Sequence, residues 1–354
     1  MPMVHEQRLR IAFALDHIVS PTWTGGAHYL KNLFVALRSL EADIQPEIVL
    51  LVSRHKPASA YRHLIDFADE VLYAPIRYSM GRFLARRAGR FAGSLDKGFS
   101  IGAFLRKRRV ELVFSMDSFG PQFSVPLLGW IPDFQHLHLP EMFPPEEVEA
   151  RNHNILRIAH SARRVILSSH AAFGDFRDFA PQFATKGALL PFVAQVPPGT
   201  FDTDPGWVCD MYNLPRRYIY LPNQFWKHKN HRLVIEALRL LKHEYPEIVV
   251  VCTGNTADPR NPDHFASLKA AIARHGLRDN IIILGLIPYS HVFPLMRQSL
   301  AVLQPSLFEG WSTTVEEAKS VGKPMLLSDI PVHREQAQHQ VGAAADLLRM
   351  TRGS

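Results

Sequence analysis

Short apolar runs recur along the whole chain, and segments with a helical apolar period separate several of them. A run of four to eight apolar residues is typical of a buried strand, whereas apolar residues three and four apart indicate a helix face. The expected strands cover residues 8–17, 48–53, 70–73, 110–115, 127–131, 165–168, 248–252, 280–285, 300–304 and 324–327, and another opens at Tyr218. The clearest helices are expected at 28–40, 232–241 and 263–275. This alternation predicts an α/β fold with doubly wound parallel sheets.

The chain length of 354 residues exceeds one ordinary core, so we expect two domains. A passage rich in Pro and Gly, VPPGTFDTDPG, marks the linker between them. We predict a first domain over 1–195, a linker over 196–216 and a second domain over 217–354. The second domain looks shortened at its C-terminal end, where an Ala-rich tail closes the chain.

The stretch QPSLFEGWSTTVEEAKSVGKP, at 304–324, indicates the end of a buried strand, a tight turn and a helix. Thr313 and Glu316 stand at capping-box spacing, which predicts Thr313 as the N-cap. A helix start carries unpaired backbone amides and a positive dipole end, and both favour a bound phosphate. Glu309 and Glu317 flank this start, so the stretch would suit a sugar diphosphate. A first-turn acid favoured by the helix dipole is the alternative interpretation of Glu317.

Glu309 and Glu317, with a Gly-Lys-Pro exit at 322–324, resemble the E-x7-E signature of the retaining glycosyltransferases of family 4. The resemblance spans roughly residues 8–336 and is strongest in the second domain. It implies the GT-B fold, in which two Rossmann-like domains face across a cleft, with the donor mainly on the second domain. It also implies that Glu309 lies beside the donor sugar and that Glu317 binds the ribose of the nucleotide.

Further positions of the resemblance concern the diphosphate and the base. Lys229 stands where relatives have a phosphate-binding Lys, and such a cation would neutralise charge on the leaving diphosphate. A solvated basic turn is the alternative. Gln224 occupies the place where most relatives have an Arg, so one positive charge of the usual pair is missing. The donor-binding positions that the resemblance implies are Gly25, Gly26, Gln224, Leu286, Ser312, Thr313, Thr314 and Glu317.

A polar cluster follows the expected strand at 127–131, and its members are Asp133, His136, His138 and Glu141. Loops at the carboxyl ends of parallel strands line the ligand crevice, so these side chains should face it. The cluster resembles the D-x-Q-H-x3-P-E-x-F segment of many bacterial family-4 sequences, which implies that Asp133 or His136 borders the anomeric centre. Many relatives have a His where this chain has Pro132. A rigid structural loop is the main alternative, and the loose His spacing disfavours a metal site.

The formal net charge of +7 is unevenly spread. Residues 77–109 contain ten Lys or Arg and one acid, interleaved with Phe, Leu and Ile. Such a segment can lie on an anionic membrane surface, although a pair of surface helices with Phe facing the core is the alternative. We expect no nucleic-acid partner. No apolar run reaches the ~18 residues of a membrane span, and two distant cysteines, Cys209 and Cys252, indicate a reducing, cytoplasmic setting. The basic segment would place the protein peripherally at the inner face of the plasma membrane.

The resemblance implies a metal-independent, retaining hexosyltransferase that moves a sugar from a GDP- or UDP-linked donor to a hydroxyl of a glycan or lipid-linked acceptor. The nucleotide sugar is a substrate, and no cofactor is expected. Two alternatives stay open. One is a catalytically impaired or truncated protein of the same fold, motivated by Gln224 and Pro132. The other is a protein whose purpose is contact with a membrane surface.

Overall fold

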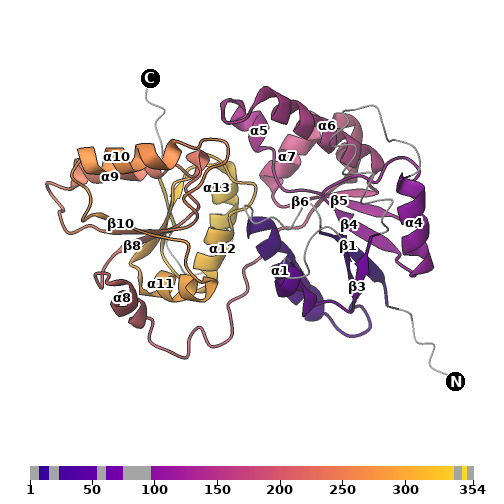
Figure 1. Ribbon diagram of the computed structural model, residues 1–354, viewed down its shortest axis with the longest axis horizontal. Coiled ribbons are helices and arrows are strands. Elements are labelled where there is room, and N and C mark those ends of the chain that lie inside the picture. The colour runs from indigo at the N-terminus through magenta and orange to yellow at the C-terminus, as the bar shows by residue number, and fades with distance from the viewer. Residues whose placement is uncertain (1–7, 16–23, 54–60, 75–96, 339–344, 349–354) are drawn as a thin grey trace. The chain divides into compact units, whose positions relative to one another are not determined.

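The computed structural model describes residues 8–15, 24–53, 61–74, 97–338 and 345–348. The chain divides into two compact units, each built on its own sheet (Figure 1). One unit comprises Met1–Phe134 and Glu146–Phe192, and the other comprises Gln135–Pro145 and Val193–Ser354. All recorded strand pairs in both sheets are parallel, which confirms the predicted fold class of two parallel-sheet α/β domains.

The described strands of the first unit form a seven-stranded sheet in the order β3-β2-β1-β4-β5-β6-β7. The strands are β1 (Arg10–Ala14), β2 (Glu47–Val52), β3 (Glu70–Tyr73), β4 (Leu112–Ser115), β5 (Leu127–Ile131), β6 (Arg164–Leu167) and β7 (Gly187–Leu189). The helices are α1 (Thr24–Arg38), α2 (Arg62–Ile65), α4 (Lys97–Lys107), α6 (Pro145–Ser161) and α7 (His170–Phe179), with a 3-10 turn, η3 (Pro181–Lys186).

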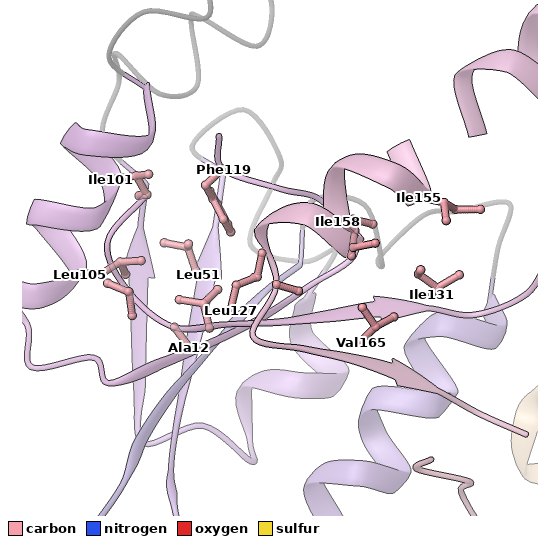
Figure 2. Close-up of a cluster of buried hydrophobic side chains, with 14 of the residues drawn as sticks. Ala12, Leu51, Ile101, Leu105, Phe119, Leu127, Ile131, Ile155, Ile158 and Val165 are labelled. Carbon is pink, nitrogen blue, oxygen red and sulfur yellow. The ribbon is translucent and has the colours of Figure 1, made fainter. Parts of the chain in front are cut away.

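Side chains of this sheet alternate between two cores, as the two-residue period of a strand requires. On β2, Val49 and Leu51 join the core beneath α4, α6 and α7, while Ile48 and Leu50 join the core beneath α1 and α2. Figure 2 shows the first of these cores, with Leu51 among the labelled side chains. Helices on both faces bury the sheet, which is why its strands carry nearly continuous apolar runs.

The basic segment predicted at 77–109 is described only from Lys97 onward, and its earlier part lies outside the described residues. In α4, Ile101 and Leu105 are buried in the core of Figure 2, so this helix packs one apolar face against the sheet. Phe99 of the same helix is 55% exposed. The described part thus combines a packed face with an exposed aromatic side chain.

The described strands of the second unit form a six-stranded sheet in the order β10-β9-β8-β11-β12-β13. The strands are β8 (Ile219–Pro222), β9 (Val250–Thr253), β10 (Ile281–Gly285), β11 (Ala301–Gln304), β12 (Met325–Ser328) and β13 (Ala345–Leu348). The helices are α5 (Gln135–His138), α8 (Trp207–Tyr212), α9 (His231–Leu241), α10 (His264–Arg274), α11 (Val292–Gln298), α12 (Thr313–Ser320) and α13 (Pro331–Gln338). Short 3-10 turns are η2 (Pro140–Met142), η4 (Lys227–Lys229) and η5 (Tyr289–His291).

Two cores again cover the two faces of this sheet. Val251 on β9 packs beneath α8, α11 and α12, whereas its neighbours Val250 and Cys252 pack beneath α9 and α10. Figure 1 shows α9 and α10 on one face and α8 and α11 on the other. Because all six strands run parallel, their carboxyl ends meet at one edge of the sheet, where ligand crevices form in such folds.

Candidate functional site

The turn between β11 and α12 begins and ends at buried polar side chains. Gln304, the last residue of β11, and Ser312, the residue before α12, have 0% and 1% of their surface exposed. Nε2 of Gln304 donates to Oγ of Ser312 at 2.9 Å, so the two ends of the turn are joined by their own side chains. Nδ2 of Asn223, just after β8, donates to Oε1 of Gln304. The turn is therefore tied to the neighbouring strand as well.

The predicted capping box is wrong by one residue. Ser312, not Thr313, is the N-cap of α12, and its hydroxyl accepts a hydrogen bond from the amide of Val315 at 3.4 Å. Glu316 therefore lies one position beyond N3, and it accepts instead from Nε2 of Gln336 and from Nζ of Lys319. Because these partners satisfy Glu316 away from the cap, its carboxylate cannot turn back to the start of the helix.

Lys229 and Glu309, 80 residues apart in the chain, form an ion pair in this turn, with Nζ 2.5 Å from Oε1. Their side chains are only 15% and 9% exposed. The same Oε1 of Glu309 accepts from Nε2 of Gln304 at 3.1 Å. Within the described part of the chain, Oε2 of Glu309 has no hydrogen-bond partner, so this oxygen can accept from a ligand.

Asn230 fixes the backbone that presents Lys229. It ends η4 in the left-handed conformation with φ of 58°, which Asn tolerates better than most residues. Its Nδ2 donates to the carbonyl of Pro305 at 3.1 Å. The turn that carries Lys229 is thereby bonded directly to the turn that carries Glu309.

Glu317 lies on α12, four residues after Thr313, and is 5% exposed. The hydroxyl of Tyr289 donates to its Oε1 at 2.8 Å. Burial raises the pKa of Glu317 to about 7, and the hydrogen bond from Tyr289 opposes that rise. Burial raises the pKa of the Tyr289 hydroxyl, and the charge of Glu317 and the hydrogen bond to it raise this pKa further. Glu317 is therefore a carboxyl group that titrates near neutral pH.

The start of α12 has two backbone amides available for a ligand. The amide of Val315 donates to Ser312 and that of Glu316 to the Ser312 carbonyl, while no described residue accepts from Thr313 or Thr314. The Thr314 hydroxyl is itself engaged, because it donates to the carbonyl of Pro222 at 3.4 Å. Two unpaired amides at the positive end of a helix form a site for an anion.

Gln224 and Leu286 lie beyond the carboxyl ends of β8 and β10 on the same edge of the sheet. Gly254, with φ of 139°, lies between these ends and donates to the carbonyl of Gly285 at 2.8 Å. A Cβ at Gly254 would lie 2.3 Å from the carbonyl oxygen of Asn223, so only Gly allows this approach. Leu286 is 72% exposed, which leaves the surface after β10 open.

The remaining predicted site residues come from the chain before Pro145. Gly25 and Gly26 lie in the first turn of α1, because this helix begins at Thr24 and not at 28 as predicted. Asp133 lies 3.5 Å from Nη1 of Arg151 in the first unit. His136 is 1% exposed and belongs to the segment that clusters with the second unit.

The segment Gln135–Pro145 is held to the second unit by polar and aromatic contacts. The guanidinium of Arg260 stacks 4.2 Å from the ring centroid of Phe143 and donates to Gln135 at 3.4 Å. The ring of His138 lies 5.0 Å from that of Phe308, the residue before Glu309. The histidine-bearing loop that the sequence singled out therefore contacts the turn that carries Glu309.

Three other sequence predictions concern absences. In the described part of the chain, no group of three or more His, Cys, Asp or Glu is placed to hold a metal ion. Cys209 and Cys252 are buried and free. None of the described helices is long and apolar enough to cross a membrane.

Comparison with known proteins shows which family and which solved structures this chain is similar to. Residues 213–346 match the family described as glycosyl transferases group 1, and that range contains Lys229, Glu309 and Glu317. The O-antigen chain mannosyltransferase RfbU of Salmonella typhimurium is 28% identical over 110 residues. That alignment spans 31% of this chain and 29% of the length of the relative, well under two thirds of it.

Solved structures resemble this chain over nearly its full length. HepE of Anabaena, in complex with UDP and glucose, has a TM-score of 0.67 at 16% identity and covers 96% of this chain and 86% of its own. WaaG, a glycosyltransferase involved in lipopolysaccharide biosynthesis, has a TM-score of 0.61 at 12% identity, covering 96% and 87%. A glycosyltransferase from Rickettsia africae has a TM-score of 0.65 at 15% identity, covering 96% and 84%. At these identities the likeness shows the shared fold, which is the GT-B architecture.

Proposed function

We propose that this chain, which carries a glycosyl transferases group 1 domain over residues 213–346, transfers a sugar from a UDP- or GDP-linked donor to a hydroxyl of a glycan or lipid-linked acceptor. The observation that carries the proposal is the ion pair of Lys229 and Glu309 beside the two unpaired amides at the start of α12. One cation, two amide donors and a carboxylate with an available oxygen match a diphosphate joined to a polyhydroxylated ring.

Lys229 and the start of α12 act on the diphosphate. The Thr313 and Thr314 amides donate to its oxygens, and Lys229 neutralises the charge that grows on it as the sugar leaves. In the structure Lys229 is paired with Glu309, so donor binding divides its ammonium hydrogens between the carboxylate and a phosphate. In this proposal Lys229 and the two amides stabilise the diphosphate without a metal ion.

Glu309 and Glu317 recognise hydroxyl groups at the two ends of the donor. Oε2 of Glu309 accepts from hydroxyls of the sugar, while Oε1 remains bonded to Lys229 and Gln304. Glu317 accepts from the ribose, with Tyr289 holding one of its two oxygens. Gln224 and the exposed surface at Leu286 complete the donor site around the ribose and base.

The acceptor side of the reaction falls to residues on the earlier part of the chain. We assign Asp133 or His136 to the border of the anomeric centre and Gly25 and Gly26 to the approach of the diphosphate. No side chain of the site stands out as a covalent nucleophile. Transfer with retention then follows a same-face displacement, in which the acceptor oxygen bonds the anomeric carbon, the sugar–phosphate bond breaks, and the acceptor proton passes to the departing diphosphate.

The test is calorimetric titration of the purified chain with UDP, GDP and their sugars, beside the variants Glu317→Ala and Glu236→Ala. Glu236 lies on the exposed surface of α9, so its variant controls for loss of a carboxylate elsewhere. We expect binding of one nucleotide that is lost in Glu317→Ala and kept in Glu236→Ala. A Glu317→Ala protein that binds the donor as the parent does would refute the assigned site. Binding without transfer would favour the catalytically impaired alternative raised by Gln224.

A second candidate function, contact with an anionic membrane surface, rests on α4. Phe99 is 55% exposed on a helix whose last turn and following residues are basic. An exposed aromatic side chain on a helix that ends in Lys and Arg suits the boundary of an anionic bilayer. Such contact would place the protein peripherally at the cytoplasmic face of a membrane. The reducing conditions there suit its two free cysteines. Sedimentation with vesicles containing phosphatidylglycerol tests this: Phe99→Ser should reduce binding, and binding equal to that of the parent would refute it.

A further inference from the structure

Helix α13 holds both ends of the turn that carries Glu309. This helix, Pro331–Gln338, follows β12 and buries two polar side chains, His333 and Gln336, both 0% exposed. Neither residue belongs to the donor site proposed above. Buried polar side chains call for an explanation, because an apolar residue of similar size would avoid the cost of desolvation.

Gln336 pairs with the backbone of Ser312 at the end of the turn. Its Oε1 accepts from the Ser312 amide at 3.2 Å, and its Nε2 donates to the Ser312 carbonyl at 3.0 Å. Nε2 also donates to Oε1 of Glu316 at 2.8 Å. One side chain thus fixes the N-cap residue of α12 at both its amide and its carbonyl, which sets the direction in which that helix starts.

His333 acts at the beginning of the turn through two serines. Its Nδ1 lies 3.0 Å from the carbonyl oxygen of Ser328, and because a carbonyl only accepts, Nδ1 carries the hydrogen. The hydroxyl of Ser328 in turn donates to the carbonyl of Ser306 at 2.6 Å. The turn between β11 and α12 is therefore held near its start by Ser328, which His333 contacts, and at its end by Gln336.

The pairing also decides which amides remain for a ligand. Since Gln336 occupies the Ser312 amide, and the Ser312 hydroxyl occupies that of Val315, the available donors are those of Thr313 and Thr314. A hydrogen bond from such an amide weakens steeply when the N–H group is turned away from the acceptor. We propose that Gln336 is a positioning residue of the donor site, which aims the Thr313 and Thr314 amides at the diphosphate without touching the ligand. This inference rests on the proposed function.

The experiment compares Gln336→Met with Gln338→Met in the full chain. Methionine keeps the length of the buried side chain and removes its hydrogen bonds, and Gln338 is an exposed residue of the same helix. UDP and GDP are titrated calorimetrically, and the one that binds the parent is compared with its matching nucleoside, whose binding is followed by ligand-observed NMR. Thermal unfolding is recorded for every protein.

A positioning role predicts a selective loss. The Kd for the nucleoside diphosphate should rise about tenfold or more in Gln336→Met, with the Kd for the nucleoside and both values of Gln338→Met within about twofold of the parent. Gln336→Leu, which removes the same hydrogen bonds to Ser312 and Glu316 without adding a charge, should show the same selectivity. This second variant replaces Gln336→Met in the experiment if the Met variant does not fold.

Other outcomes overturn the inference. Equal losses of diphosphate and nucleoside binding would show that the substitution disturbs the whole binding site. Unchanged diphosphate binding would show that Gln336 does not orient the Thr313 and Thr314 amides. Failure of both Gln336 variants to fold would assign the residue to stability alone. A parent that binds neither UDP nor GDP would overturn the proposed function and this inference with it, whereas binding by the parent that survives in Gln336→Met would overturn the inference only.

Discussion

The surroundings of Glu309 and Glu317 differ in kind, although both residues belong to one short stretch. Glu309 faces a cation, since Lys229 and the amide of Gln304 both donate to its Oε1. Among the described residues, Glu317 has one hydrogen-bond donor, the neutral Tyr289, and burial raises its pKa to about 7. The charge of Glu309 is therefore balanced by a cation, whereas the charge of Glu317 depends on pH near neutrality. Each difference can be removed separately.

The largest effect is expected when the cation is removed from Glu309. Lys229→Met deletes the charge that offsets the departing diphosphate and, among the described residues, leaves the mostly buried Glu309 carboxylate with Gln304 as its one partner. We expect transfer to fall by roughly 10²–10³-fold. Lys227→Met is the matched control, because Lys227 lies in the same 3-10 turn and is exposed. A rate of sugar transfer within threefold of the parent for Lys229→Met would show that the ion pair is structural.

The second effect comes from making Glu317 permanently neutral. Glu317→Gln keeps the shape and the bond from Tyr289 but loses the charged acceptor, so nucleotide binding should weaken about 10–100-fold. Calorimetric Kd values measure this directly. The variant Glu236→Gln, on the exposed surface of α9, is expected to bind like the parent.

The same variant should be more stable than the parent at alkaline pH. The pKa of Glu317 is about 7 in the folded protein against an ordinary value of 4.5, so the folded state keeps a proton that the unfolded state releases between these values. The free energy of unfolding of the parent therefore falls as pH rises through this window. Glu317→Gln lacks that loss, so its Tm should exceed that of the parent at pH 8 and approach it at pH 4.5. A lower Tm at pH 8 would contradict the raised pKa.

The pH dependence of binding sharpens the comparison further. If ribose hydroxyls donate to ionised Glu317, the parent should bind the nucleoside most tightly above pH 7 and weaken towards tenfold per unit below it. The nucleoside is the appropriate probe because a terminal phosphate titrates near pH 6 itself. Ligand-observed NMR between pH 5.5 and pH 8.5 gives the profile. Glu317→Gln should give a flat one, and a titration that persisted in this variant would have to come from another group.

The strand pattern and the short motifs could be predicted from the sequence because they depend on local order. The strand at 127–131 matches β5 at both ends, and α9 begins one residue before its predicted start. The two-residue and 3.6-residue periods decide these elements without reference to distant residues. The start of α12 was predicted to within one residue, because the cap is Ser312 and not Thr313.

The partners that give each carboxylate its character could not be predicted in the same way. Tyr289 is 28 residues from Glu317, and Gln336 is 24 residues from Ser312, so only the folded sheet brings them together. Two signals were present in the sequence. Gln304 is a polar residue that closes an apolar strand, and the passage SDIPVHREQ, which contains His333 and Gln336, places polar residues on a helix that the fold buries.

The smallest predicted effect concerns the hydroxyl of Tyr289, which donates a hydrogen bond to the buried Glu317 carboxylate. The bond from Tyr289 stabilises the ionised carboxylate and so lowers the pKa of Glu317 from the still higher value that burial alone would set. Tyr289→Phe removes the bond and keeps the ring, so the midpoint of the nucleoside-binding profile should move to higher pH, with binding at pH 7 weakened a few-fold. Tyr245→Phe, at an exposed position, controls for loss of a hydroxyl. A midpoint that moved to lower pH would show that Tyr289 destabilises the ionised form of Glu317 instead. The direction of the shift therefore shows whether Tyr289 stabilises the ionised form of Glu317, as Lys229 stabilises that of Glu309.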